Sequence, residues 1–264
     1  MKINVNNAPI HVATGGKSID PALPAVVFLH GSGLDHRTWA LQSRWFAFRG
    51  HTVVAPDLPG HSLSGGRPLR SIEKQADWLW DLLDTLGIAT ASLVGHSQGA
   101  LIALEAASRE PQRVRSLSVV ASAHAVPVNP ALLEMAKTDQ TAAVDAMLSW
   151  GFSDAYLGGM SHVPGQAPIA IGHRIMSANP LHADLTCSNA YRNGLTAAAT
   201  VTAPTQLILA RDDKMTVLKG GMVLRDALPN VQDVTVLDGV GHMLPIEAPD
   251  AVLRHLSAFI TALD

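Results

Sequence analysis

The chain has 264 residues, 47% of them apolar, and this length favours one large single-core domain with at most a smaller appendage. Lys and Arg number 19 against 22 Asp and Glu, and the formal net charge of −3 indicates neither a nucleic-acid nor an anionic-membrane partner. A single cysteine, Cys187, excludes an intrachain disulfide and is typical of a reducing compartment, so we expect a cytoplasmic protein.

Residues 1–16 alternate apolar and polar side chains and lack the continuous apolar run of a signal peptide, so they predict an opening strand or hairpin. No later apolar run approaches the roughly 20 residues that a membrane-spanning helix needs. We therefore expect no membrane partner. The sequence leaves a monomer and a homodimer open.

Short apolar runs then alternate with longer segments of helical period, a pattern typical of a mostly parallel sheet with helices on both faces. The predicted strands are Ala25–His30, His51–Ala55, Ala91–Gly95, Val114–Ala121, Thr205–Ala210 and Val234–Leu237. The predicted helices are Arg37–Phe48, Ser71–Leu86, Gln98–Arg109 and Pro249–Ala262. The fold class is therefore α/β.

The alternation fails in the middle of the chain. Helical patches such as Pro130–Trp150 are followed by a stretch with several Gly and Pro residues, 158–168. We interpret residues 123–202 as an inserted, mainly helical cap, and residues 1–122 and 203–264 as the core domain.

The segment Gly95-His96-Ser97-Gln98-Gly99 matches G-x-S-x-G at the junction of a predicted strand and a predicted helix. Flanking glycines allow a turn tight enough to force the serine into strained backbone geometry and expose its hydroxyl. An ordinary helix N-cap is the alternative role for such a serine. Because the strand and helix context is present, we predict that Ser97 is a nucleophile.

A serine nucleophile needs a base, and in this type of site the chain order is nucleophile, acid, histidine. His242 alone, among the histidines after Ser97, sits in a Gly-rich turn that follows a late strand. The others, which we interpret as structural, are His124, His162, His173, His182 and His255. His242 is therefore the candidate base.

His242 follows the predicted strand Val234–Leu237. The acid that orients the base should follow the strand before that one in the chain. Asp212 and Asp213 both stand there, directly after Thr205–Ala210, and either carboxylate fits. Oxyanion donors in such sites are backbone N–H groups, one after the nucleophile and one from an earlier strand-to-helix loop. These positions are Gln98 and Ser32, although the glycines around Ser32 also permit a simple tight turn.

Other chemistries lack their sequence patterns. There is no H-E-x-x-H pattern and no convincing Cys/His cluster, and the glycine-rich segments complete neither phosphate-binding fingerprint. We expect no metal and no cofactor. Cys187 is interpreted as a small buried residue rather than a nucleophile.

Four ordered motifs, His30–Gly33, Asp57–Ser64, Gly95–Gly99 and Gly241–Pro249, together resemble those of the α/β-hydrolase superfamily, in its cap-bearing, serine esterase-like branch. The resemblance covers nearly the whole chain. It implies the α/β-hydrolase fold, with a mostly parallel central sheet and an inserted helical cap.

The resemblance also favours one acid. Members of the family commonly carry it in a G-x-x-D-x-x-T-P-like segment, and aligning residues 210–217 with this segment puts Asp213 in the acid's place. Ala210 and Val217 depart from the usual Gly and Pro, so Asp212 stays an alternative. Ser62, where the family often has Gly, is a departure that touches no catalytic role.

The expected activity is hydrolysis of a small carboxylic ester, or a related acyl bond, through an acyl-enzyme on Ser97. Carbon–carbon bond hydrolases, cofactor-free haloperoxidases or perhydrolases, and non-catalytic receptors share the fold and are alternatives. A dehalogenase would have Asp at position 97. The candidate substrate-binding residues are Trp150, Phe152, Tyr156, Met160, Met176 and Met243. Packing within the cap would account for most of them equally well.

Overall fold

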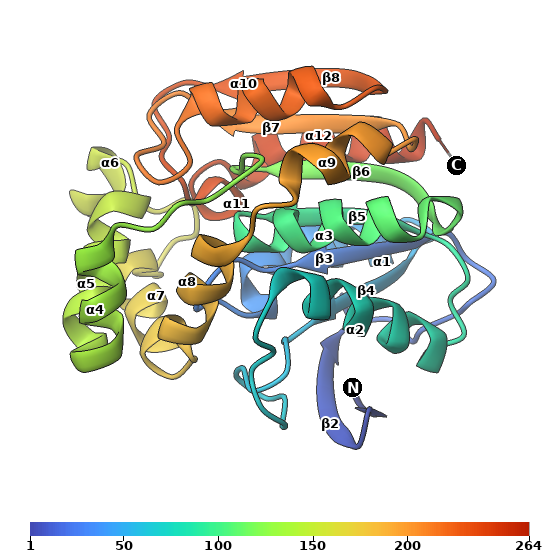
Figure 1. The fold of residues 1–264 in the computed structure, drawn as a ribbon, viewed down its shortest axis with the longest axis horizontal. Coiled ribbons are helices and arrows are strands. Elements are labelled where there is room, and N and C mark those ends of the chain that lie inside the picture. The colour runs from blue at the N-terminus through green and yellow to red at the C-terminus, as the bar shows by residue number, and fades with distance from the viewer. Residues whose placement is uncertain (264) are drawn as a thin grey trace.

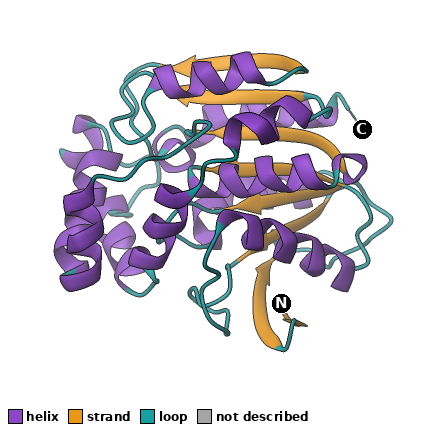
Figure 2. Ribbon diagram, viewed as in Figure 1, coloured by secondary structure: helices purple, strands orange, loops and turns teal. Residues whose placement is uncertain are grey.

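Eight strands form one sheet in the order β1-β2-β4-β3-β5-β6-β7-β8 in the computed structural model, which describes residues 1–263 (Figure 2). The strands are β1 (Lys2–Val5), β2 (Ala8–Ala13), β3 (Ala25–Leu29), β4 (Thr52–Pro56), β5 (Ala91–His96), β6 (Val114–Val120), β7 (Thr205–Ala210) and β8 (Val231–Leu237). From β4 to β8 the strands run parallel, and the β1–β2 hairpin adds an antiparallel edge. The predicted α/β class is confirmed.

The central strands are apolar on both faces because helices cover both faces. In β3, Val26 and Phe28 join one apolar layer while Val27 and Leu29 join the other, as the two-residue period of a strand requires. Helices α2 (Ile72–Thr85), α3 (Gln98–Arg109), α9 (Gly194–Thr200) and α10 (Leu218–Ala227) cover the face toward the viewer in Figure 1. Helices α1 (Ala40–Ala47) and α12 (Pro249–Thr261) cover the opposite face.

Helix α3 lies deepest in the front layer. Its side chains from Gln98 to Ala107 are all buried, because the helix packs on the sheet and is flanked by α2 and α9. Alanines at positions 100, 103, 106 and 107 keep the helix close to the strands. This close packing fixes the end of α3 that begins at Gln98, next to Ser97.

Five helices between β6 and α9 form a separate group against one end of the sheet, which we call the helical insert (residues 130–190; Figure 1). They are α4 (Pro130–Thr138), α5 (Gln140–Gly151), α6 (Asp154–Leu157), α7 (Pro168–Ser177) and α8 (Leu181–Ala190). The segment 130–150 is two helices rather than one patch, since Asp139 ends α4 and caps α5 by accepting the Ala142 N–H at 3.1 Å. Helix α9, placed in the cap by the sequence, instead packs with α3 and α10 on the sheet.

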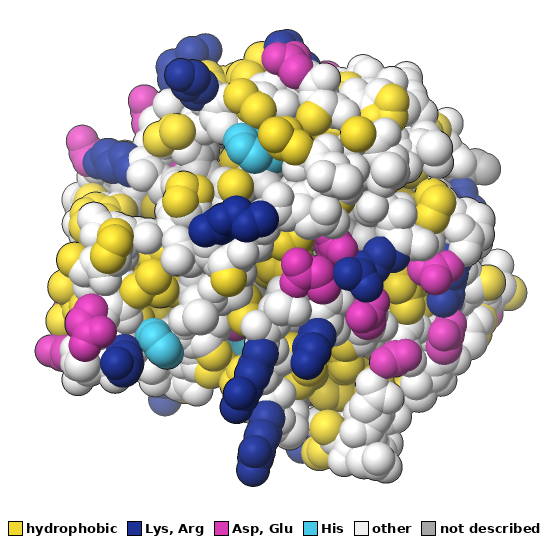
Figure 3. All heavy atoms as spheres, viewed as in Figure 1, with side chains coloured by type: hydrophobic (Ala, Val, Ile, Leu, Met, Phe, Trp, Pro, Cys, Tyr) yellow, Lys and Arg dark blue, Asp and Glu magenta, His cyan; other side chains and the backbone are white. Residues whose placement is uncertain are grey.

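Three short helices complete the secondary structure: η1 (His36–Trp39), η2 (Pro111–Arg113) and α11 (Leu244–Glu247). Within residues 1–263, no helix combines the length and apolar character needed to cross a bilayer. Basic, acidic and hydrophobic side chains are interspersed on the face shown in Figure 3.

Leu93, at the centre of β5, is fully buried, so Leu93→Ala should lower the free energy of unfolding by about 2–5 kcal/mol through lost burial and a residual cavity. Leu41→Ala, on the exposed face of α1, should change it by about 0.5 kcal/mol or less. Urea unfolding of both variants measures the difference. Equal losses of stability in the two variants would contradict a buried Leu93 and an exposed Leu41.

Candidate active site

Ser97 occupies the turn between β5 and α3 with φ 54° and ψ −118°, a backbone conformation that L residues rarely adopt. Backbone atoms pack closely against the α-carbons of Gly95 and Gly99, on either side of Ser97, and this packing holds the turn. A Cβ on Gly95 would lie 2.3 Å from the Gly99 carbonyl oxygen, and one on Gly99 would lie 2.3 Å from that of Leu29. The Ser97 N–H donates to the Val120 carbonyl at 3.0 Å. The G-x-S-x-G pattern is therefore a steric requirement at this position.

His242 and Asp213 are brought together by the loops that follow β8 and β7. The His242 Nδ1 atom lies 2.8 Å from Asp213 Oδ2, and both side chains are buried. Asp212 points away, because it is exposed and accepts the Gly239 N–H at 3.1 Å. The geometry therefore pairs Asp213, not Asp212, with His242.

The Asp213 carboxylate is surrounded by donors. Its Oδ1 accepts the backbone N–H groups of Met215 and Thr216, each at 2.8 Å, and its Oδ2 also accepts the Thr216 hydroxyl at 2.8 Å. Burial by itself would raise the pKa of Asp213, but His242 and the Thr216 donors outweigh burial and lower the pKa below its ordinary value. Asp213 therefore stays ionised and can stabilise a proton on His242.

His96 lies behind His242, with ring centroids 4.9 Å apart. Its Nε2 lies 2.9 Å from the His242 carbonyl oxygen, a contact that requires the proton on Nε2. Burial, followed by the nearby His242, lowers the pKa of His96 to about 3. His96 is therefore a neutral support for the backbone of His242.

Ser32 and Gln98, the two predicted oxyanion positions, lie side by side although they are 66 residues apart in sequence. The Ser32 hydroxyl donates to Gln98 Oε1 at 2.8 Å, and Gln98 Nε2 donates to Gln75 Oε1 at 3.2 Å. The loop after β3 is thus tied to the start of α3. The adjacent strands β3 and β5 pair with Leu29 opposite Gly95. This register brings the backbone around Ser32, after β3, next to the backbone around Gln98, after β5.

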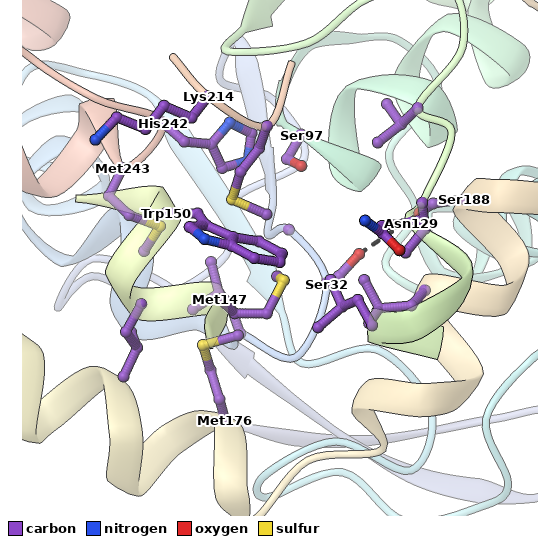
Figure 4. A pocket seen from close by; sticks show the side chains of 18 of the residues that line it. Ser32, Ser97, Asn129, Met147, Trp150, Met176, Ser188, Lys214, His242 and Met243 are labelled. Atoms are coloured by element: carbon purple, nitrogen blue, oxygen red, sulfur yellow. Dashed lines mark hydrogen bonds between the residues drawn. The ribbon is translucent and has the colours of Figure 1, made fainter. Parts of the chain in front are cut away.

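A cavity of about 450 Å³ lies between this edge of the sheet and the helical insert. In Figure 4, Ser97 and His242 lie near each other on one wall, with Met147 and Met176 across from them and Asn129 and Ser188 to one side. The lining is mostly apolar and includes Leu34, Leu132, Met147, Leu148, Trp150, Met176, Leu185, Met215 and Met243. Such a cavity accommodates a small, largely apolar molecule next to Ser97.

Three of the six predicted pocket residues line this cavity: Trp150, Met176 and Met243. Phe152 and Tyr156 do not, because their rings stack on each other 5.6 Å apart inside the insert, and the Tyr156 hydroxyl donates to the Ile246 carbonyl. Met160 does not either, since it lies half exposed in a second, more open hollow of the insert. These three side chains are therefore not part of the lining of the cavity next to Ser97.

A model of the alpha/beta hydrolase family matches residues 26–255. The chain belongs to the alpha/beta hydrolase family. Among curated proteins, this alpha/beta hydrolase is 40% identical over 99 residues to the dihydrolipoyllysine-residue acetyltransferase component of the acetoin cleaving system of Pseudomonas putida. It is 35% identical over 118 residues to an epoxide hydrolase of Caballeronia sordidicola. These matches cover 37% and 44% of this chain but only 26% and 34% of the relatives.

Solved structures resemble this alpha/beta hydrolase over almost its whole length. The enol-lactonase from Burkholderia xenovorans LB400 is 22% identical with a TM-score of 0.87, covering 99% of this chain and 100% of that one. A thermophilic esterase from Thermogutta terrifontis is 20% identical with a TM-score of 0.84, covering 100% and 98%. At these identities the likeness shows a shared fold alone.

The sequence missed several polar residues of the alpha/beta hydrolase cavity. Asn129, Ser188 and Lys214 line it, and only Asn129 carried a local signal, as the residue before a helix that begins with Pro. Its Oδ1 caps α4 by accepting the Ala131 N–H at 2.8 Å. Ser188 comes from α8, whose position could not be read from local sequence.

One cluster away from the cavity has donor atoms close enough for a metal ion: His11, His36 and Asp57. The His36 Nδ1 lies 2.7 Å and the His11 Nδ1 3.1 Å from the Asp57 carboxylate. That carboxylate also accepts the backbone N–H groups of His36 and Leu63. Each of its oxygens thus faces two nitrogens, an arrangement of a hydrogen-bonded structural carboxylate.

The buried His96 of this alpha/beta hydrolase family member predicts a pH effect on stability. The unfolded chain protonates this histidine near pH 6.5, whereas the folded chain does so only near its pKa of about 3. The unfolded state binds the extra proton between these values, so stability falls as the pH falls. His96 should therefore remove about 2 kcal/mol between pH 7 and pH 5.

His96→Gln retains a side-chain donor but cannot titrate. Urea unfolding at pH 7 and pH 5 should show a smaller loss of stability in this variant than in the wild type. Identical losses in the two proteins would contradict a buried neutral His96.

Proposed function

We propose that this protein is a serine hydrolase that cleaves small carboxylic esters through an acyl-enzyme intermediate. The observation that carries the proposal is the strained Ser97 turn, which borders the same apolar cavity as His242, the histidine paired with Asp213. A nucleophile, a base with its orienting acid, and an enclosed apolar site are the parts that acyl transfer requires.

In the proposed mechanism, Ser97 Oγ attacks the ester carbonyl and its proton passes to His242 Nε2. His242 Nδ1–H faces Asp213 Oδ2 at 2.8 Å, and the ionised carboxylate stabilises the imidazolium. The backbone N–H groups of Ser32 and Gln98 are the proposed donors to the tetrahedral oxyanion. His242 then protonates the leaving alcohol, which leaves the acyl group on Ser97. In the second half, water gives a proton to His242 and attacks the acyl carbon, and His242 returns the proton to Ser97 Oγ as the carboxylic acid is released.

The cavity supports a small substrate. Its volume of about 450 Å³ and its lining of Met, Leu and Trp side chains favour a short apolar acyl or alcohol group. The similar structures include esterases and an enol-lactonase, which are ester-cleaving in kind. Carbon–carbon hydrolysis and perhydrolysis would use the same side chains, and no residue lining the cavity favours them over ester hydrolysis. A cytoplasmic location and the absence of a cofactor remain part of the proposal.

Ser97→Ala should reduce kcat/KM for a short p-nitrophenyl ester by roughly 10⁴- to 10⁶-fold, because the nucleophile is lost while the cavity is kept. It should also abolish labelling by a fluorophosphonate probe. Ser257→Ala, at the surface of α12, is the matched control and should retain full activity. Turnover near the wild-type level in Ser97→Ala would reject the proposal, and an inert wild type that resists the probe would favour a receptor.

Asp213→Asn and Asp212→Asn form a second, paired test. Asp213→Asn should lower kcat by roughly 10³- to 10⁴-fold, because His242 loses the charge that fixes its tautomer and stabilises its protonated form. Asp212→Asn should change kcat less than about threefold, since Asp212 is exposed and its carboxylate accepts the Gly239 N–H. The reverse order of effects would assign the acid to Asp212.

A further inference from the structure

Two polar side chains of the helical insert hold the loop that follows β3. Asp184, on α8, accepts the Gly33 N–H on Oδ2 at 2.7 Å. The same oxygen lies 2.8 Å from Nε2 of His61, in the loop after β4. Asp184 and His61 are each about 1% exposed, so this is a buried pair that joins the insert to two loops of the core.

Asn179, between α7 and α8, makes a second bridge to the same loops. Its Nδ2 donates to the carbonyls of Gly33 at 3.0 Å and Leu34 at 2.8 Å. Its Oδ1 accepts the Ser62 N–H at 2.8 Å. Ser62 has φ 46°, so Asn179 also holds a strained turn. Both backbone groups of Gly33 are therefore bonded to the insert.

The loop that these contacts hold carries the proposed Ser32 oxyanion donor. Gly33, next to it, has φ 69°, and a Cβ there would lie 2.9 Å from Leu181 of the insert, so the loop is pressed against α8. An oxyanion donor acts only within about 2.7–3.1 Å of the developing charge. Small shifts of Gly33 would therefore move the Ser32 N–H out of range.

The buried pair requires a charged His61. Its Nε2 faces the Asp184 carboxylate and its Nδ1 faces the Pro59 carbonyl at 3.2 Å, and both partners are acceptors only. Both ring nitrogens must therefore carry protons. Burial alone would lower the pKa of His61, but Asp184 and the hydrogen bonds to Asp184 and Pro59 raise it above its ordinary value.

The other titratable groups facing this pair are His30, Asp57 and Cys187. His30, whose ring centroid lies 5.2 Å from that of His61, accepts the Leu58 N–H and faces the Gly31 carbonyl, an arrangement that fits one neutral tautomer. Burial lowers the pKa of His30 and raises that of the Cys187 thiol to about 12, so both stay neutral near pH 7. Asp57, with a lowered pKa, adds negative charge that favours protonated His61.

We propose that Asp184 and Asn179 of the insert, with protonated His61, are positioning residues for the Ser32 oxyanion donor, so that the insert completes the catalytic geometry as well as covering the cavity. The inference rests on the proposed esterase function. Asp184, Asn179 and His61 would then affect kcat, and not only the choice of substrate, without touching the ester or Ser97.

The first test compares Asp184→Ala and Asp184→Asn with Tyr191→Phe. Tyr191 is a matched control because its buried hydroxyl ties the end of the insert to Glu105 on α3 at 2.8 Å without touching the loop after β3. Asp184→Ala should lower kcat on a short p-nitrophenyl ester by roughly 10- to 100-fold with KM changed less than about threefold. Asp184→Asn, which keeps an acceptor for Gly33, should fall between Asp184→Ala and the wild type. Equal effects of Asp184→Ala and Tyr191→Phe, or a loss confined to KM, would overturn the inference.

The second test uses pH. A histidine with a raised folded pKa contributes its ion pair below that pKa and loses it as the pH rises through it. Wild-type kcat should therefore fall on the alkaline side, whereas His61→Gln, which donates to Asp184 without titrating, should have a lower kcat and lack this fall. The same alkaline fall in His61→Gln would remove His61 from the proposal.

Amide hydrogen exchange separates this inference from the proposed function. Faster exchange in residues 31–34 of Asp184→Ala than of Tyr191→Phe, both measured against the wild type, would support the role of Asp184 in holding the loop after β3. Unchanged exchange would reject it. An inactive wild type would instead reject the esterase function, while the exchange result would still decide whether the insert holds the loop.

Discussion

The backbone of Ser97 is held in a conformation that costs an L residue about 1–3 kcal/mol, and the rest of the site is arranged around that constraint. The strained conformation persists because close packing and strand pairing prevent the turn from relaxing to another backbone conformation. Gly95 and Gly99 permit backbone contacts that any Cβ would block, and β5 is hydrogen-bonded to a strand on each side. The serine hydroxyl is thereby presented at the end of the sheet, where the loops after β3, β7 and β8 meet it.

The cavity is a joint product of two parts of the chain. The core supplies Ser97 and His242, and the insert supplies much of the apolar wall, including Met147, Trp150 and Met176. Methionine side chains are unbranched and adapt to irregular shapes, so this wall suits apolar groups of more than one form. The polar contacts between insert and core are different in kind, because they are buried, directional and short.

Much of the fold could be predicted because the central strands are continuous apolar runs with turn residues at both ends. Helix α3 has the predicted bounds, and β3, β5 and β6 differ from prediction by one residue at one end. Strand β8 begins at Val231, three residues before the predicted start at Val234. Gln232 and Asp233 are polar and exposed at the edge of the sheet, so this part of the strand has no apolar run to mark it in the sequence.

The site was predictable where chemistry is tied to local geometry. Ser97 and His242 stand in turns with a recognisable pattern, but the choice between Asp212 and Asp213 needed the direction of each side chain. The cavity wall was less predictable, since it depends on how the helices of the insert are rotated against each other. Trp150 faces the cavity while Phe152, two residues later, faces the interior of the insert.

The register between β3 and β5 has a consequence for how the protein acquires its chemistry. Leu29 lies opposite Gly95, and a slip of one residue would turn the side chains of the slipped strand to the opposite face of the sheet. Ser32 and Gln98 meet only through this pairing, across 66 positions of sequence, and His242 reaches His96 across 146. No single segment therefore contains a partial version of the site. The proposed ester turnover would then appear only in molecules whose long-range pairing is complete, which would make it a sensitive reporter of finished folding.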